Sequence, residues 1–161
     1  MRDRIWKHII NIKFKALYTN ECSRLAGKYT RILGFSLATI SAASVATWAI
    51  WKQQTTTWAV IIGIAQIIQI AIPFIPFLKH EKELLAWSFE LESLYLEYEE
   101  LWHSLADGTL NPTKAKARLK ELRRKELEIN KSYKEVSCPE VVRWKKKIKE
   151  ATDEELSLDF S

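Results

Sequence analysis

Polar residues inside an otherwise apolar stretch are the first feature of this chain with chemical meaning. Gln66, Gln69, Pro73 and Pro76 follow one another at spacings of three, four and three, which places them on one face of a helix. Side-chain amides are costly against lipid, so this face should contact a partner helix, another subunit or water. Two interpretations stay open: interhelical hydrogen bonds that fix an oligomer, or a pore lined by Gln66 and Gln69. The two prolines remove backbone donors and favour a bend.

Two dense clusters of cations lie in the last third of the chain. The candidate ligand-binding residues are Lys116, Lys120, Arg123 and Arg124 in the first cluster, and Arg143, Trp144 and Lys147 in the second. Cations beside an aromatic ring can hold phosphates and stack a base. They can equally pair with Glu-rich helices or bind anionic lipid headgroups. The pattern leaves three partners open: other helices, a nucleotide, nucleic-acid or protein ligand, and lipid.

No arrangement typical of an enzyme stands out. His8, His80 and His103 are not at the spacings of metal ligands, and no glycine-rich loop could cradle a phosphate. Cys22 and Cys138 form no CxxC motif and predict free thiols in a reducing compartment. We therefore expect no catalysis, no cofactor and no metal.

Two charge-free apolar stretches, Ile32 to Trp51 and Gln53 to Leu78, must position the glutamines. Only Lys52 separates them, and Thr57 to Leu78 is the part of the second that suits lipid. About 20 helical residues cross a hydrocarbon core of about 30 Å. The pattern predicts a transmembrane hairpin with spans at 32–51 and 57–78. The alternative is a pair of buried core helices in a soluble domain.

Small residues recur at every fourth position of the first span, at Gly34, Ala38, Ala42 and Ala46. Such a stripe lets helix backbones approach one another closely. It predicts a helix-packing face, either within the hairpin or between subunits.

Charges near the apolar stretches indicate the orientation. Residues 1–31 carry eight Lys or Arg and two carboxylates, and Lys79 and Lys82 follow the second span. The excess of cations favours a cytoplasmic location for both termini. The basic amphipathic segment 1–31 could lie along the membrane surface or extend the first span inward.

Residues 79–150 predict a cytoplasmic helical domain, and residues 151–161 an acidic tail. The first helix carries a heptad pattern at Leu84, Trp87, Leu91, Leu94, Tyr98, Leu101 and Leu105. The second carries it at Ala115, Leu119, Leu122, Ile129, Tyr133 and Val136, with Glu126 at a core position. Asp107-Gly108 breaks the first helix, and Asn111-Pro112 begins the second as N-cap and N1. The two helices pair as a hairpin or pack between subunits.

A short basic helix should follow the second heptad helix. Ser137 to Glu140 has the pattern of a capping box that opens a helix ending near Lys149. Thr152 to Glu155 could cap another turn, and we expect the last residues to be disordered.

The layout resembles the SLATT family of two-span bacterial effectors. The likeness runs from Ile12 to about Leu105 and consists of KFKALYTNECSRLAGKYTRILG entering the first span, the short loop, the second span, and LKHEKELLAWSFELESLYLEYEELW leaving it. The resemblance implies a pore-forming effector of anti-phage defence in the bacterial inner membrane. It also implies control by a nucleotidyltransferase partner or its oligonucleotide product. Residues after Asp107 lie outside the likeness.

The sequence thus predicts an all-α, two-span membrane protein with a basic N-terminal helix and a coiled-coil-like cytoplasmic hairpin. We expect the lipid bilayer as its partner and a homo-oligomer of about four subunits, because one two-span subunit cannot enclose a pore. Opening would disrupt the membrane and arrest growth. The alternative function is a non-conducting membrane anchor that recruits a cytoplasmic partner.

Overall fold

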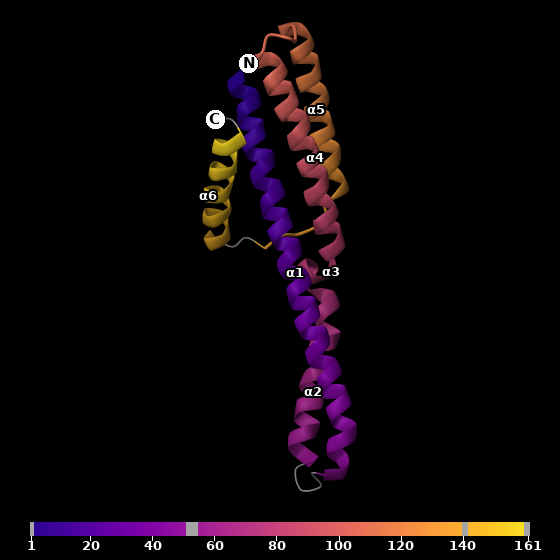
Figure 1. Cartoon of the computed structure of the whole chain (residues 1–161). Helices are drawn as coiled ribbons and strands as arrows, with labels where there is room; N and C mark the ends of the chain where they lie inside the picture. The colour runs from indigo at the N-terminus through magenta and orange to yellow at the C-terminus, as the bar shows by residue number, and fades with distance from the viewer. Residues whose placement is uncertain (1, 51–54, 140–141, 160–161) are drawn as a thin grey trace.

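The computed structural model describes residues 2–50, 55–139 and 142–159, and it is all-helical over these residues (Figure 1). The all-α class predicted from the sequence is therefore confirmed. In chain order, the elements are α1 (Arg2–Ile50), α2 (Thr55–Ala71), the 3-10 helix η1 (Ile72–Phe74), α3 (Pro76–Lys79), α4 (Glu81–Ala106), α5 (Pro112–Ser132) and α6 (Val142–Asp159). The side chains of 42–50 and of a few other helical residues lie outside the description.

Helix α1 is the longest helix of the described structure, and most of the other helices pack against it. It comprises 49 residues without a break, which corresponds to about 74 Å at a rise of about 1.5 Å per residue. The basic N-terminal segment and the first apolar stretch are therefore one helix, with no boundary at Arg31. Residues 2–31 thus extend the first apolar helix, which is one of the two arrangements predicted for them.

The core forms between α1, α4 and α5. Its buried residues are Ile5, Ile9, Ile12 and Ala16 of α1, Leu91, Leu94, Tyr95, Tyr98 and Leu101 of α4, and Ala115, Leu119, Leu122 and Ile129 of α5. Most of the heptad positions predicted on α4 and α5 thus lie in the core, with Trp87, Leu105 and Tyr133 packed at its edge. Leu84 is buried outside this cluster, and Val136 is half-buried beyond the end of α5. The third helix of this core is α1, which the sequence reading did not place there.

The turn between α4 and α5 follows the sequence. Gly108 has a φ of 70°, a left-handed conformation that glycine adopts without steric cost. The Asn111 side chain accepts a hydrogen bond from the backbone N–H of Thr113 at 2.9 Å, and Pro112 is the first helical residue. The predicted break, N-cap and N1 proline are all confirmed.

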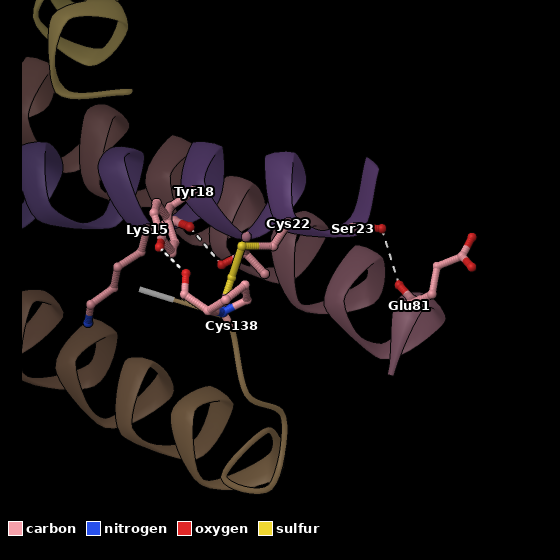
Figure 2. Close-up of a disulfide and its surroundings, with 8 residues drawn as sticks. Lys15, Tyr18, Cys22, Ser23, Glu81 and Cys138 are labelled. Atoms are coloured by element: carbon pink, nitrogen blue, oxygen red, sulfur yellow. Dashed lines mark hydrogen bonds between the residues drawn. A yellow bond between two sulfur atoms is a disulfide. The ribbon is translucent and has the colours of Figure 1, made fainter. Parts of the chain in front are cut away.

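A disulfide joins Cys22 of α1 to Cys138, which lies in the segment that leads from α5 to α6 (Figure 2). The expectation of two free thiols is therefore wrong, because the fold brings residues 116 positions apart to a Cα–Cα distance of 6.3 Å. Beside it, the hydroxyl of Tyr18 donates to the carbonyl oxygen of Pro139 at 2.5 Å. Both contacts fasten the α5–α6 connection to α1.

Helix α6 is longer than the sequence reading predicted, since it runs from Val142 to Asp159 rather than ending near Lys149. Thr152 caps no new turn: it is 1% exposed inside the helix, and its hydroxyl donates to the Ile148 carbonyl at 2.7 Å. Leu156 is buried against the core, so most of the predicted acidic tail is part of a packed helix. Glu140, the last residue of the predicted capping box, lies outside the described residues.

Ion pairs connect the helices at the edge of the core. Lys13 Nζ lies 3.0 Å from Glu92 Oε1 of α4 and 2.9 Å from Glu155 Oε2 of α6. Burial lowers the pKa of Lys13, but the hydrogen bonds to the two carboxylates outweigh it and leave the pKa raised. Glu126, the acid at a predicted core position of α5, pairs with Lys15 at 3.2 Å.

The outer part of α1 and helix α2 form a two-helix arm that projects beyond the core (Figure 1). Large apolar side chains are exposed on both helices of the arm: Ile32, Phe35, Val60, Ile64, Ile67 and Ile70. Phe74 of η1 is exposed just beyond α2. Over the part of the chain that the structure describes, no helix combines the length and the hydropathy needed to cross a membrane.

Candidate functional site

The first basic cluster lines a concave surface on α5, here called the basic groove. It has a volume of about 680 Å³ and is lined by Arg4, Lys116, Ala117, Leu119, Lys120, Glu121, Arg123, Arg124 and Leu127. All four candidate residues predicted on α5 lie in it. Their spacing puts them on the outward face of an amphipathic helix whose opposite face packs into the core.

Four cations of the basic groove lack a close anionic partner. No described carboxylate oxygen lies within 4.0 Å of the nitrogens of Arg4, Lys116, Lys120 or Arg123. Arg124 is different, because its Nε lies 3.4 Å from Glu128 Oε1. Like charges held together in this way favour the binding of an anion, which would remove their mutual repulsion.

Other cations of α5 are already neutralised within the chain. Arg118 contacts Glu97 Oε2 of α4 at 3.4 Å, and Lys125 pairs with the same carboxylate. The hydrogen bond from Arg118 to Glu121 raises the pKa of the guanidinium. Pairing with the acidic helix, one of the three partners considered, therefore accounts for Arg118 and Lys125 but not for the cations of the groove.

Sequence reasoning missed Arg4 and Leu127. Arg4 comes from the start of α1 and reaches the groove only because α1 packs beside α5 in the core. Leu127 is 69% exposed among the cations and gives the groove an apolar patch. Among the described lining residues there is no aromatic ring, so the groove offers phosphate contacts without base stacking.

The second basic cluster is not part of this groove. Trp144 is half-buried and Lys147 exposed on α6, while the side chain of Arg143 lies outside the described residues. Helix α6 packs against α1, and α5 packs against α4, so the two clusters lie on different sides of the molecule (Figure 1).

A second hollow, of about 700 Å³, lies at the N-terminal end of α1 beside α6. Arg2, Asp3, Trp6, Trp102, Asp153 and Leu156 are among its lining residues. The rings of Trp6 and Trp102 have centroids 6.0 Å apart, and the Arg2 guanidinium lies 5.1 Å from the Trp102 centroid. No local sequence pattern predicts this arrangement, because its residues come from three helices.

The polar face predicted on the second span is exposed in a single chain. Gln66 and Gln69 lie on α2 with exposed side chains, whereas the side chains of Pro73 and Pro76 lie outside the described residues. The backbone changes from α-helix to 3-10 helix at Ile72, just before the first proline. The helix is thus interrupted where the prolines predicted a bend.

The small-residue stripe of the first span points away from α2 where it is described. Gly34 and Ala38 are exposed, and a methyl group added at Gly34 would meet nothing within 4 Å. The side chains of Ala42 and Ala46 lie outside the described residues. Gly34 therefore makes no close packing contact with α2 in a single chain.

No group of His, Cys, Asp or Glu suited to a metal ion occurs in the described part of the chain. Comparison with protein-family models, with curated proteins and with solved structures found no match to this chain.

Proposed function

We propose that the chain is a membrane-inserted, self-assembling effector that forms an ion-conducting pore, and that it acts in bacterial antiviral defence. The observation that carries this proposal is the projecting arm. From Ile32 to the end of α3 the sequence contains only two charged residues, Lys52 and Lys79. The arm also exposes large apolar side chains, such as Phe35 at 76% and Ile67 at 67%.

Exposure of these apolar side chains to water is unfavourable, with a free-energy cost of about 25 cal/mol per Å² of apolar surface. Lipid or other subunits would remove it from water, and the arm offers no charged residue that opposes burial between Ile32 and Trp51. Arg24, Lys28 and Arg31 of α1, together with Lys79, lie at the inner end of the arm, which supports cytoplasmic termini. The second span of the proposal includes α2, η1 and α3 together.

The exposed amides support assembly into a pore. The side-chain amides of Gln66 and Gln69 are energetically unfavourable against lipid. An oligomer of four or more subunits would direct them toward a central path. The exposed Gly34 and Ala38 then supply a close contact between neighbouring subunits.

Control by a nucleotide or oligonucleotide signal, which the resemblance implies, is part of the proposal. The basic groove supports it, since Arg4, Lys116, Lys120 and Arg123 are cations without a close carboxylate. A nucleotidyltransferase would then supply the signal as a partner enzyme.

The test is single-channel recording from the purified full chain in planar bilayers, with Gln69→Leu as the variant. We expect discrete conductance steps that Gln69→Leu reduces without loss of the oligomer. Ile70→Leu, at an exposed apolar position one residue further along α2, is the matched control and should conduct as the unmodified chain does.

Exchange of the arm for unrelated apolar helices distinguishes the pore hypothesis from the membrane-anchor hypothesis. An anchor tolerates the exchange and a pore does not. Full growth arrest with the exchanged arm would therefore overturn the pore and leave the anchor.

A further inference from the structure

The charged side chains of helix α6 are distributed unfavourably with respect to its helix dipole. Its first half contains Lys and Arg residues, and its second half contains the acids Glu150, Asp153, Glu154 and Glu155. The N-terminus of a helix is the positive end of its dipole and the C-terminus the negative end, so both halves oppose the field of the peptide groups. This arrangement favours external cations near the C-terminal end of α6.

Within one chain only part of this acidic end is neutralised. Glu155 pairs with Lys13 at 2.9 Å. Glu150, Asp153 and Glu154 are exposed, and no described cationic nitrogen lies within 4.0 Å of their carboxylates. We call these three residues the acidic patch of α6.

The acidic patch and the basic groove lie at the same level of α1 but on different sides of it. Arg4 lines the groove together with α5, while Asp153 shares a hollow with Arg2 and Trp6. Figure 1 shows α5 and α6 separated by α1 and α4 near the N-terminal end of the molecule. Unpaired cations and unpaired anions therefore lie on two separate flanks of one subunit.

We propose that the acidic patch of one copy docks into the basic groove of the next copy. This inference rests on the proposed function, because it names the cytoplasmic contact of the same oligomer. The nucleotide signal of that proposal would then compete with the neighbouring copy for the cations of the basic groove. A head-to-tail contact of this kind is heterologous, and it closes into a ring when the rotation between copies allows it. A ring places every arm at an equivalent distance from one axis, as a pore requires.

The charges on the two surfaces are opposite in sign and similar in number. Four cations without close carboxylates meet three carboxylates and the negative end of the α6 dipole, and the long Lys and Arg side chains can reach across the contact. Leu127 lies among the cations and supplies an apolar contact. Screening over about 10 Å at 0.1 M salt should make the contact sensitive to ionic strength.

The experiment uses the full chain reconstituted in liposomes from an equal mixture of isotope-labelled and unlabelled copies. A carbodiimide joins a lysine to a carboxylate only where the two touch. We expect mass spectrometry to find mixed-label peptides that link Lys116 or Lys120 to Asp153 or Glu154. Added salt should lower their yield.

Charge reversal makes the test specific. We expect Lys120→Glu with Arg123→Glu, and separately Asp153→Lys with Glu154→Lys, to lower the yield of mixed-label links through the remaining Lys–carboxylate pairs by about tenfold. Combining all four changes in one chain should restore links between the reversed positions. Lys131→Glu, about three turns from Lys120 on the same helix, is the matched control and should change nothing. Because all these side chains are exposed, each variant should keep its helical circular dichroism.

Each other outcome overturns the contact in a different way. If the oligomer and its conductance persist without mixed-label links, the contact is wrong and the proposed function stands. If the chain is monomeric and silent, both fail. If a single-stranded oligonucleotide protects Lys116 and Lys120 while no mixed-label link forms without it, the groove binds the nucleic acid and not the neighbouring copy.

Discussion

Cys22 and Cys138 form a disulfide across 116 residues of sequence, with their Cα atoms 6.3 Å apart. The bond joins the middle of α1 to the segment that leads into α6 (Figure 2). Cys22 is fully buried, so the bond lies inside the packed region on the α1 side. The disulfide and the Tyr18 hydrogen bond together hold α6 beside α1.

Reduction of this disulfide should destabilise the fold. Closing a loop of this length removes chain entropy from the unfolded state, a contribution of about 4–5 kcal/mol in the chain-entropy model. We expect Cys22→Ala with Cys138→Ala to unfold at clearly lower denaturant concentration than the oxidised chain. The same shift should follow when a dithiol reduces the unmodified chain. Rapid labelling of two thiols in the native, unreduced chain would contradict the assignment.

Loss of the Lys13 ammonium should weaken the attachment of α6 to the core. Lys13 is 7% exposed, but its partners Glu92 and Glu155 have side chains that are 40% and 45% exposed. Because these carboxylates can regain water, Lys13→Met should cost only about 1–2 kcal/mol of unfolding free energy. Denaturant titration measures it, and a double-mutant cycle with Glu155→Gln separates the α6 contact from that with Glu92. Additive effects in the cycle would show that Lys13 and Glu155 are not coupled.

Stability should fall at high pH. Burial and the hydrogen bond to Glu90 raise the pKa of Tyr133 to about 12, and burial also raises the pKa of Tyr98. The raised pKa of Lys13 acts in the same direction. In each case the folded chain keeps a proton that the unfolded chain releases near pH 10, so stability is complete below about pH 10 and lost as pH rises through the folded pKa values.

The measurement for this pH dependence is denaturant unfolding between pH 9 and pH 12, a range set by the approximate reference pKa values. Tyr133→Phe keeps the ring that stacks on Trp87 at 5.8 Å, but it removes the titrating hydroxyl. It should therefore flatten part of the alkaline loss. An unchanged slope would mean that Tyr133 titrates alike in the folded and unfolded chains.

Replacement of Gly108 should destabilise the α4–α5 turn. Its φ of 70° is unfavourable for any residue with a Cβ, so Gly108→Ala should cost about 1 kcal/mol even though no neighbour lies within 4 Å. Gly63→Ala is the control, because Gly63 is helical and equally open. It should be neutral or stabilising by up to about 1 kcal/mol. The thermal unfolding temperature should fall for Gly108→Ala and should stay the same or rise for the control. Equal falls in the two variants would contradict the role of φ.

The heptad positions of α4 and α5 could be predicted because most of the buried residues there are apolar and regularly spaced. The same spacing exists on α1 at Ile5, Ile9, Ile12, Ala16, Thr19, Ser23 and Ala26, all buried. Two of these seven are polar, and charged residues stand between them. The pattern is therefore typical of an amphipathic helix on a surface. A polar residue can nevertheless be buried when it has a hydrogen-bond partner, as Ser23 does: its hydroxyl donates to the Glu81 carbonyl at 3.1 Å.

The basic groove was predictable only in its α5 half. Lys116, Lys120 and Arg123 share one face of a single helix, which the local sequence determines. Arg4 lies more than a hundred residues away and joins them through tertiary packing, which no local pattern records. The disulfide was hidden for the same reason, since two cysteines in different segments carry no signal of their proximity.

The continuity of α1 has a mechanical consequence. An unbroken helix of 49 residues behaves as a stiff rod, and the basic groove and the acidic patch both lie near one end of it. A tilt of about 5° at that end moves the other end, about 74 Å away, by about 6 Å. A rearrangement of α5 against Arg4 that tilted α1 would therefore displace the far end of the arm by about the same distance.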